Sequence, residues 1–292
     1  MRRGVVAGVS AYLIWGLFPL YWPLLEPAGA VEILAHRMIW SLLAMALVLT
    51  ALRQWRAIRA IPLRVWLLVA LAAALIAVNW GVYIYAVNNG QVIGASLGYF
   101  MNPLVSVLIG VLALGERLRP VQWTAVGLGV AAAVVISISG GRIPYLSVVL
   151  ALSFGCYGLV KKVVPLTPTV SLTAEGMVLA IPAAATVIAL QASGDGTLTD
   201  NGIGHVVLLL LTGVVTVIPL LAFGRAAQAL PLSVLGLLQY LTPVVQFLLG
   251  VLWAHESMPP ARWAGFGLIW CALVLLSADA LRRARRSRVA YS

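Results

Sequence analysis

The chain has 292 residues, of which 62% are apolar and only 9% are charged. Soluble domains contain about 25% charged residues, so this composition excludes a water-soluble globule and indicates a protein of the lipid bilayer. The net charge of +11 would point to a nucleic-acid partner in a soluble protein, but in a membrane protein the basic residues first define topology. Cys156 and Cys271 lie far apart in apolar runs, a pattern typical of neither a metal site nor a disulfide framework.

Ten apolar runs are each long enough to cross the hydrocarbon core as a helix, which requires about 20 residues. They cover residues 4–24, 30–52, 65–88, 92–114, 121–138, 145–163, 169–190, 203–223, 230–252 and 261–281. The runs are unbroken and do not alternate in polarity, which argues against a β-barrel. We therefore expect an all-α integral membrane protein with ten transmembrane helices and no soluble domain.

The basic residues are distributed unevenly between the two sides of the membrane. If both termini are cytoplasmic, all but three of the 19 Lys and Arg residues lie on the cytoplasmic side, the exceptions being Arg37, Arg142 and Arg262. This bias favours that orientation and an even number of helices. The tail 282–292 is strongly basic, and we expect it to contact anionic membrane lipid rather than nucleic acid.

The chain also contains an internal repeat, because residues 98–131 align without gaps with residues 238–271. The matched pairs include Phe100 with Tyr240, Pro103 with Pro243, Gly110 with Gly250, Glu116 with Glu256, Pro120 with Pro260, Trp123 with Trp263 and Gly127 with Gly267. We infer two five-helix halves, residues 1–140 and 141–281, followed by the tail. Since five is odd, the second half is inverted relative to the first, which is the architecture of secondary transporters.

Several motifs carry a resemblance to a known family. They are ILAHRMIWS at 33–41, VNW at 78–80, SLGYFMNPLV at 96–105, GERL at 115–118, SFGCYGL at 153–159 and LGLLQY at 235–240. In these motifs the chain resembles the RarD-type permeases of the EamA group, in the drug/metabolite transporter superfamily. The resemblance implies ten helices, a cytoplasmic (inner) membrane location, cytoplasmic termini and export of small metabolites or drugs. Such permeases are commonly labelled by chloramphenicol sensitivity or resistance.

Polar and aromatic side chains near the middle of five predicted helices are candidates for substrate binding. They are Trp15, Asn79, Trp80, Tyr83, Tyr99, Asn102, Tyr157, Gln239 and Tyr240. An amide or phenol in hydrocarbon loses its water contacts, so these groups are expected to face the bundle interior or a wet cavity. There they could recognise an aromatic or amphipathic solute by stacking and hydrogen bonds. The alternative is that each one only joins two helices.

Two charged residues lie well inside predicted helices, Arg37 in the second and Glu175 in the seventh. Charges at such depths are costly and usually mark function or a buried pair. The functional hypothesis is that Glu175 exchanges a proton while Arg37 orients substrate or locks the outer gate, with the titratable His36 beside it. The alternative is that these side chains only form structural hydrogen bonds.

The repeat duplicates two further kinds of residue. Pro103 and Pro243 lie within predicted helices at equivalent positions, so we expect hinges or unwound segments there; passive kinks are the alternative. Glu116 and Glu256 each precede a proline by four residues and are interpreted as helix-end and turn residues.

Other protein classes are less compatible with the sequence. The eight acids and three histidines are scattered singly, so neither a metal site nor a metal-dependent enzyme is predicted, and no phosphate-binding glycine loop or other cofactor motif occurs. The expected partners are a small-molecule substrate and membrane lipid. The function indicated is a secondary-active transporter of small metabolites or drugs that works by alternating access, with export and proton coupling as hypotheses; a channel or scaffold subunit is the alternative. The oligomeric state is left open, and a monomer is compatible with the sequence.

Overall fold

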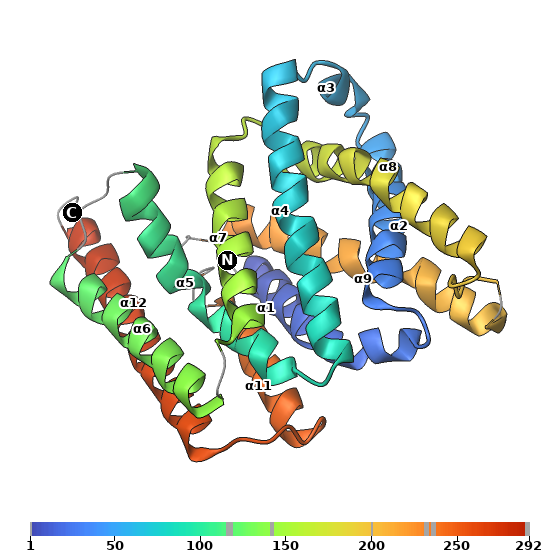
Figure 1. Ribbon diagram of the computed structural model, residues 1–292. Coiled ribbons are helices and arrows are strands. Elements are labelled where there is room, and N and C mark those ends of the chain that lie inside the picture. Colours follow the sequence, from blue (N-terminus) through green and yellow to red (C-terminus); the bar gives the residue numbers. More distant parts are fainter. Residues whose placement is uncertain are drawn as a thin grey trace.

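The computed structural model describes residues 2–114, 119–140, 143–199, 201–230, 234 and 238–289, and within these ranges the chain is helical with short connections (Figure 1). The helices are α1 (Arg2–Gly16), α2 (Ala30–Ala51), α3 (Trp55–Arg59), α4 (Leu63–Asn88), α5 (Val92–Leu114), α6 (Pro120–Gly140), α7 (Tyr145–Val163), α8 (Pro168–Ser193), α9 (Gly202–Ala229), α11 (Leu241–Leu252) and α12 (Pro260–Val289). In the described part of the chain, nine helical segments are long and apolar enough to cross a membrane, and α11 is a shorter apolar helix. The prediction of an all-α membrane protein is confirmed.

The first predicted span, residues 4–24, does not form one continuous α-helix as expected. The α-helix ends at Gly16, and two short 3-10 helices follow, Phe18–Leu20 and Trp22–Leu25. Each of these contains a proline near its start, Pro19 or Pro23. Proline lacks the N–H that a continuing α-helix requires, which explains why the regular helix stops.

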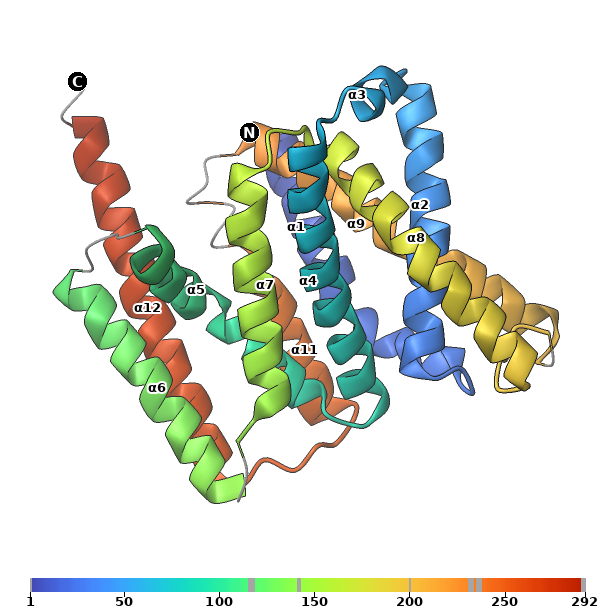
Figure 2. The same cartoon turned by 45° about the horizontal axis from the view of Figure 1, so that its top comes forward.

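The ninth predicted span, residues 230–252, is not described as one helix. Residues 231–233 and 235–237 lie outside the described part, the chain turns at Gln239 and Tyr240, and α11 begins at Leu241. Pro243 therefore lies in the first turn of a helix, where a missing N–H is tolerated. Pro103 lies inside α5, which bends along its length (Figures 1 and 2). The hinge role of both prolines stays a prediction.

The helix contacts are repeated between the two halves of the chain, so that a contact made by two helices recurs between their counterparts. α1 packs against α9 as α4 packs against α7, and α5 contacts α7 as α11 contacts α1. α2 packs against α9 as α8 packs against α4, and three further interfaces join a helix to its own counterpart: α2 with α8, α5 with α11, and α6 with α12. The last pair lies side by side along one edge of the molecule, while α2, α8 and α9 lie together on the other side (Figures 1 and 2). The start of α1 and the end of α12 lie on the same side of the bundle (Figure 2).

Two glycines permit the closest helix crossings around the interior. A Cβ atom on Gly213 of α9 would lie 2.4 Å from the carbonyl group of Trp40 in α2, and one on Gly98 of α5 would lie 2.8 Å from the carbonyl oxygen of Ser147 in α7. Any larger residue would push these backbones apart. The crossing at Gly213 matters for the site, because it brings the next turn of α9 against α2.

Glu256 is a helix-end residue, as predicted, but the helix it serves is α5 rather than the one preceding it. From the loop between α11 and α12, its carboxylate accepts hydrogen bonds from the backbone N–H groups of Val92 and Ile93, the second at 3.2 Å. These are the donors that a helix leaves unpaired in its first turn. The loop and α5 are thereby joined across the two halves. Glu116, its counterpart in the repeat, lies outside the described residues.

Glu256 gives the fold a pH dependence that can be measured. Burial raises the pKa of its carboxyl group from 4.5 to about 7, against the opposing effects of the hydrogen bonds from Ile93 and Val92 and the charge of Arg262. The folded protein therefore keeps a proton up to about pH 7 that the unfolded chain releases near pH 4.5, so this group makes the fold less stable as pH rises through that window.

We expect the melting temperature of the wild type in detergent to fall relative to that of Glu256→Gln between about pH 5 and pH 8. Glutamine still accepts the two backbone hydrogen bonds but does not titrate. The effect should stay below about 2 kcal/mol, because solvent reaches part of the carboxyl group. A gap between the two proteins that does not change with pH would contradict the prediction.

Candidate substrate site

A buried amide connects three helices in the interior. Asn79 of α4 is 1% exposed, and its side-chain amide donates to the carbonyl oxygen of Leu150 and to the hydroxyl of Ser153, both in α7 and both at 3.0 Å. Its carbonyl oxygen accepts a hydrogen bond from the hydroxyl of Tyr99 in α5 at 3.2 Å. With donor and acceptor both engaged, the desolvation cost of the amide is offset and α4, α5 and α7 are held in one register.

A second amide extends this network to the other half of the chain. The side-chain amide of Gln246, in α11, donates to the hydroxyl of Tyr83 at 2.9 Å and to the carbonyl oxygen of Trp15 at 3.3 Å. The ring of Tyr83 meets that of Tyr99 edge to face, with centroids 5.5 Å apart. Gln246 was missed by sequence reasoning, which selected Gln239 in the same apolar run. Its signal was an amide in an otherwise apolar segment, four residues after Thr242 and therefore on the same helix face.

An aromatic series continues from the network to Glu175, the charged residue of α8. The ring of Tyr99 contacts that of Phe154 at 6.4 Å between centroids, and Phe154 contacts Tyr157 at 6.1 Å. The hydroxyl of Tyr157 donates to a carboxylate oxygen of Glu175 at 3.1 Å. The structure thus brings five predicted residues, Trp15, Asn79, Tyr83, Tyr99 and Tyr157, into one connected set. We call this set, together with Gln246, the central network.

Three predicted residues lie elsewhere. Tyr240, in the turn before α11, packs in the apolar cluster around Phe247, which includes residues of α12. Gln239 precedes it in the same turn. Asn102 lies one turn beyond the network in α5, and its buried carbonyl oxygen has no hydrogen-bond partner in the described part of the chain. The sequence predicts how deep these residues lie in the membrane, but it does not predict which neighbouring helix each side chain faces.

Arg37 occupies a closed aromatic cage beside the network. It is 2% exposed, and its Nε donates to the hydroxyl of Thr216 in α9 at 2.9 Å. The guanidinium carbon lies 3.8 Å from the ring centroid of Trp80, 5.1 Å from that of Trp22 and 5.5 Å from that of Phe18. Trp80 is therefore placed against Arg37 rather than within the central network. The contact with Thr216 depends on the close crossing at Gly213, one turn earlier in α9.

The Arg37 guanidinium has an unused donor group. Its Nη1 atom is buried, with no hydrogen-bond partner in the described part of the chain. Two ion pairs are present there, Arg119 with Asp279 and Lys161 with Glu175, and Arg37 belongs to neither. Since burying an unpaired charge is costly, this arrangement calls for a counter-charge.

His36, adjacent to Arg37, faces a different environment, as expected for neighbouring helical residues about 100° apart. Its Nδ1 accepts a hydrogen bond from the indole of Trp40 at 3.2 Å, and Glu32 and His205 lie within electrostatic range. Glu32 is buried and accepts hydrogen bonds from the backbone N–H and the hydroxyl of Thr197, at 2.8 and 3.1 Å. This carboxylate, one turn before His36, was not singled out in the sequence.

Glu175 is buried in an ion pair that the sequence did not predict. Lys161 of α7 donates to one of its carboxylate oxygens at 2.6 Å, and Ser171 donates to the same oxygen at 2.8 Å. Lys161 also hydrogen-bonds Ser171 directly. From the sequence, Lys161 was expected only to mark a membrane boundary. Its partner lies in a different predicted span, so only the tertiary structure, which brings the end of α7 near the start of α8, could reveal the pair.

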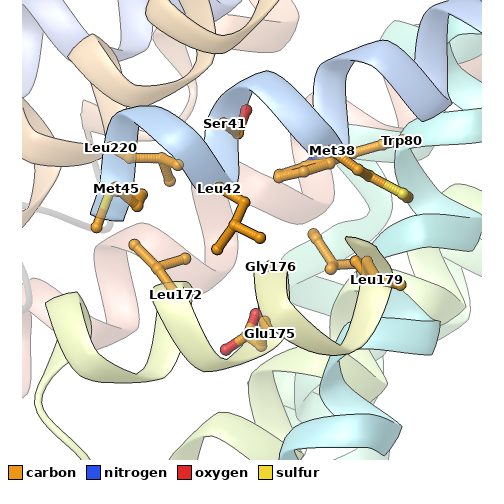
Figure 3. Close-up of a pocket in the computed structure, with 11 residues that line it drawn as sticks. Met38, Ser41, Leu42, Met45, Trp80, Leu172, Glu175, Gly176, Leu179 and Leu220 are labelled. Atoms are coloured by element: carbon orange, nitrogen blue, oxygen red, sulfur yellow. The ribbon is translucent and has the colours of Figure 1, made fainter. Parts of the chain in front are cut away.

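Glu175 also borders a small cavity between α2 and α8 (Figure 3). Leu42 of α2 faces Gly176 of α8 across it, and Trp80 contributes to its wall. Its volume of about 30 Å³ is enough for one or two water molecules. A metabolite cannot enter unless α2 and α8 move apart, so this region is closed in the structure.

Apolar helices of spanning length, an interface pattern that exchanges two halves, and a polar network drawn from both halves define a multi-pass membrane transporter of the inverted-repeat class. Comparison with known proteins identifies the family. The family model described as "EamA-like transporter family" matches residues 2–138 and 143–278, and the chain belongs to that family.

Two relatives and one solved structure extend this assignment. The chain is 58% identical to Protein RarD of Streptomyces exfoliatus, over 98% of this chain and 92% of that protein. It is 40% identical to the uncharacterized transporter YojE of Bacillus subtilis, over 98% and 97% of the two chains. A solved crystal structure superposes with a TM-score of 0.62 at 17% identity, over 93% of this chain and 96% of that one, and supports the fold alone. The expectations of a RarD-type permease and of a transporter rather than an enzyme are confirmed.

The Lys161–Glu175 pair makes a quantitative stability prediction. Lys161→Met leaves the Glu175 carboxylate buried without its cation and should cost about 3 kcal/mol. In Lys161→Met combined with Glu175→Gln no charge remains, so the double variant should be more stable than Lys161→Met alone. Thermal unfolding in detergent measures the differences. The exposed neighbouring lysine provides the control, since Lys162→Met should change stability by less than about 0.5 kcal/mol. Additive effects of the two substitutions would contradict the pairing.

Proposed function

We propose that the protein is a secondary-active carrier that exports small metabolites or drugs across the cytoplasmic membrane by alternating access. The observation that carries this proposal is the central network, in which Gln246 of the second half bonds Tyr83 of the first and Asn79 joins three helices. Stacking surfaces and hydrogen-bonding groups gathered at the junction of two inverted halves are what a carrier needs to bind an amphipathic solute and expose it to alternate sides.

The orientation that we propose places both termini in the cytoplasm. It is supported by the distribution of basic residues, and by the position of the start of α1 and the end of α12 on one side of the bundle (Figure 2). In this orientation the Lys161–Glu175 pair lies toward the cytoplasm. The Glu32–Thr197 contact and the Glu256 cap on α5 lie toward the outside.

These contacts would act as two gates. Opening toward the cytoplasm separates α7 from α8 and strains the Lys161–Glu175 pair, whereas opening outward strains the bonds from Thr197 to Glu32 and the cap on α5. Pro103 inside α5 and the turn before Pro243 would provide positions at which helices can flex. Because equivalent helix interfaces occur in both halves, the state open to the cytoplasm and the state open to the outside would have similar packing energies.

Glu175 is the group that we propose to couple transport to protons. A proton on its carboxylate removes the attraction to Lys161 and frees α7 from α8. The hydroxyl of Tyr157, bonded to the same carboxylate, links this event to the aromatic rings of the central network. Proton uptake would thus weaken the inner gate and, at the same time, shift the side chain of Tyr157, which would face the substrate.

Flux measurements test the carrier proposal. The protein is reconstituted into liposomes and tested with phenicols, aromatic amino acids and other small metabolites. We expect saturable flux for at least one solute, and Tyr83→Phe should raise its KM about threefold to tenfold, because one hydrogen bond of the network is lost. Tyr85→Phe is the control, since Tyr85 is 44% exposed and lies on another face of the same helix. Flux that does not saturate would instead support a channel, and no flux would support a scaffold subunit.

A separate prediction concerns proton coupling. In inverted vesicles, Glu175→Gln should retain solute exchange but lose the stimulation of flux by a pH gradient, because glutamine keeps the hydrogen bonds without titrating. Lys162→Met again serves as the control and should keep the pH dependence. If Glu175→Gln transports with the same pH dependence as the wild type, a residue other than Glu175 binds the coupled proton.

A further inference from the structure

The charge of Arg37 is the strongest unexplained feature of the interior. The two buried acids among the described residues already have their donors: Glu32 accepts from Thr197, and Glu175 accepts from Lys161 and Ser171. The one hydrogen-bond partner recorded for the Arg37 side chain in the described part of the chain is the neutral hydroxyl of Thr216. The protein thus encloses a cation without supplying its counter-charge.

The aromatic cage stabilises this cation but does not neutralise it. Trp80, Trp22 and Phe18 present rings to the guanidinium, and rings carry no net charge. A ring stacked on the guanidinium covers its face and leaves the in-plane N–H groups available. One of these edges is used by Thr216, while the buried Nη1 has no partner in the described residues. A planar fork of donors with a free edge matches the geometry of a carboxylate.

We propose that Arg37 supplies the counter-charge for the substrate, and that the transported solutes are organic anions in which a carboxylate is joined to an apolar or aromatic body. This inference rests on the proposed carrier function and names the substrate class for the same interior. The carboxylate would bind at the Nη1 edge of Arg37, and the body would lie against the aromatic side chains nearby. Tyr83 of the central network lies about one turn after Trp80 in α4.

The surroundings favour an anion over a zwitterion such as an amino acid. An ammonium group would need an acid beside the aromatic walls, and the acid that touches the aromatic series, Glu175, is occupied by Lys161. Access to Arg37 requires movement, because Trp80 stacks on the guanidinium on one side and forms part of the wall of the small cavity (Figure 3). Separation of α2 from α8 would therefore open a route that begins at this tryptophan.

Matched solutes test the substrate class directly. Proteoliposomes are supplied with 3-phenylpropionate, its neutral amide 3-phenylpropanamide, or the zwitterion phenylalanine. We expect saturable uptake of the carboxylate, with kcat/KM at least tenfold above that of either other solute. Arg37→Gln should abolish this preference, and Arg37→Lys should raise KM for the carboxylate at least fivefold, because an ammonium group lacks the bidentate fork. Thr216→Val keeps the charge and removes the neutral partner, so the preference should remain.

Binding in detergent provides a readout that does not need transport. Since Trp80 and Trp22 flank Arg37, 3-phenylpropionate should change the tryptophan fluorescence and raise the melting temperature of the wild type, whereas the amide should do neither. Both effects should be lost in Arg37→Gln and weakened in Arg37→Lys. If Arg37→Gln does not fold, Arg37→Lys decides: unchanged carboxylate affinity in this variant would overturn the proposal.

The two readouts separate this inference from the carrier proposal. Binding of carboxylate that depends on Arg37, without flux of any solute, would support the anion site and contradict the carrier function. Saturable flux of neutral solutes, without binding or preference for carboxylates, would support the carrier and overturn the anion site. Failure of carboxylates in both assays overturns the inference.

Discussion

The interior of this protein is governed by the cost of polar groups in hydrocarbon, where no water replaces a missing partner. Asn79 and Gln246 each bond across helices that are distant in sequence, Glu175 bonds across the consecutive helices α7 and α8, and these bonds fix which faces meet. Arg37 differs, because it is enclosed by rings and a single hydroxyl. In a bundle where the other buried charges have donors or counter-charges, an enclosed cation of this kind identifies the position at which a ligand would complete the structure.

In the carrier that we propose, the duplicated architecture would allow such an interior to open to either side. Three of the large interfaces join helices to their own counterparts, α2 to α8, α5 to α11 and α6 to α12, so the two halves meet along a series of symmetric contacts. The carboxylate of Glu256 caps a helix of the opposite half, and Thr197 bonds Glu32 in the same way across the halves. Contacts of this kind tie the halves at their ends, while the central network joins them in the middle. In the proposed mechanism, movement of one half against the other would break the contacts at the ends, whereas the contacts of the central network could remain.

Sequence reasoning identified a large part of the candidate site and failed in a consistent way. Asn79, Tyr83, Tyr99 and Tyr157 were predicted because a polar group in mid-span must face the interior, and they do form one network. Tyr240 fulfils the same depth criterion but packs against α12, because helix depth does not specify which neighbour a face will meet. Lys161, Thr216 and Glu32 were missed for the complementary reason, since each acquires its role only from a partner in another helix.

The sequence by itself determined the membrane environment, the helical class, the two inverted halves and the family, since these depend on composition, run length and repeated motifs along one dimension. The tertiary structure alone decided that Glu175 is paired with Lys161, that Glu256 caps α5, and that Arg37 is enclosed without a counter-charge. These facts depend on the rotation of each helix about its axis and on close crossings such as that at Gly213. An apolar run with little amphipathic pattern does not encode that rotation, because lipid and protein interior are nearly equivalent surroundings for most of its side chains.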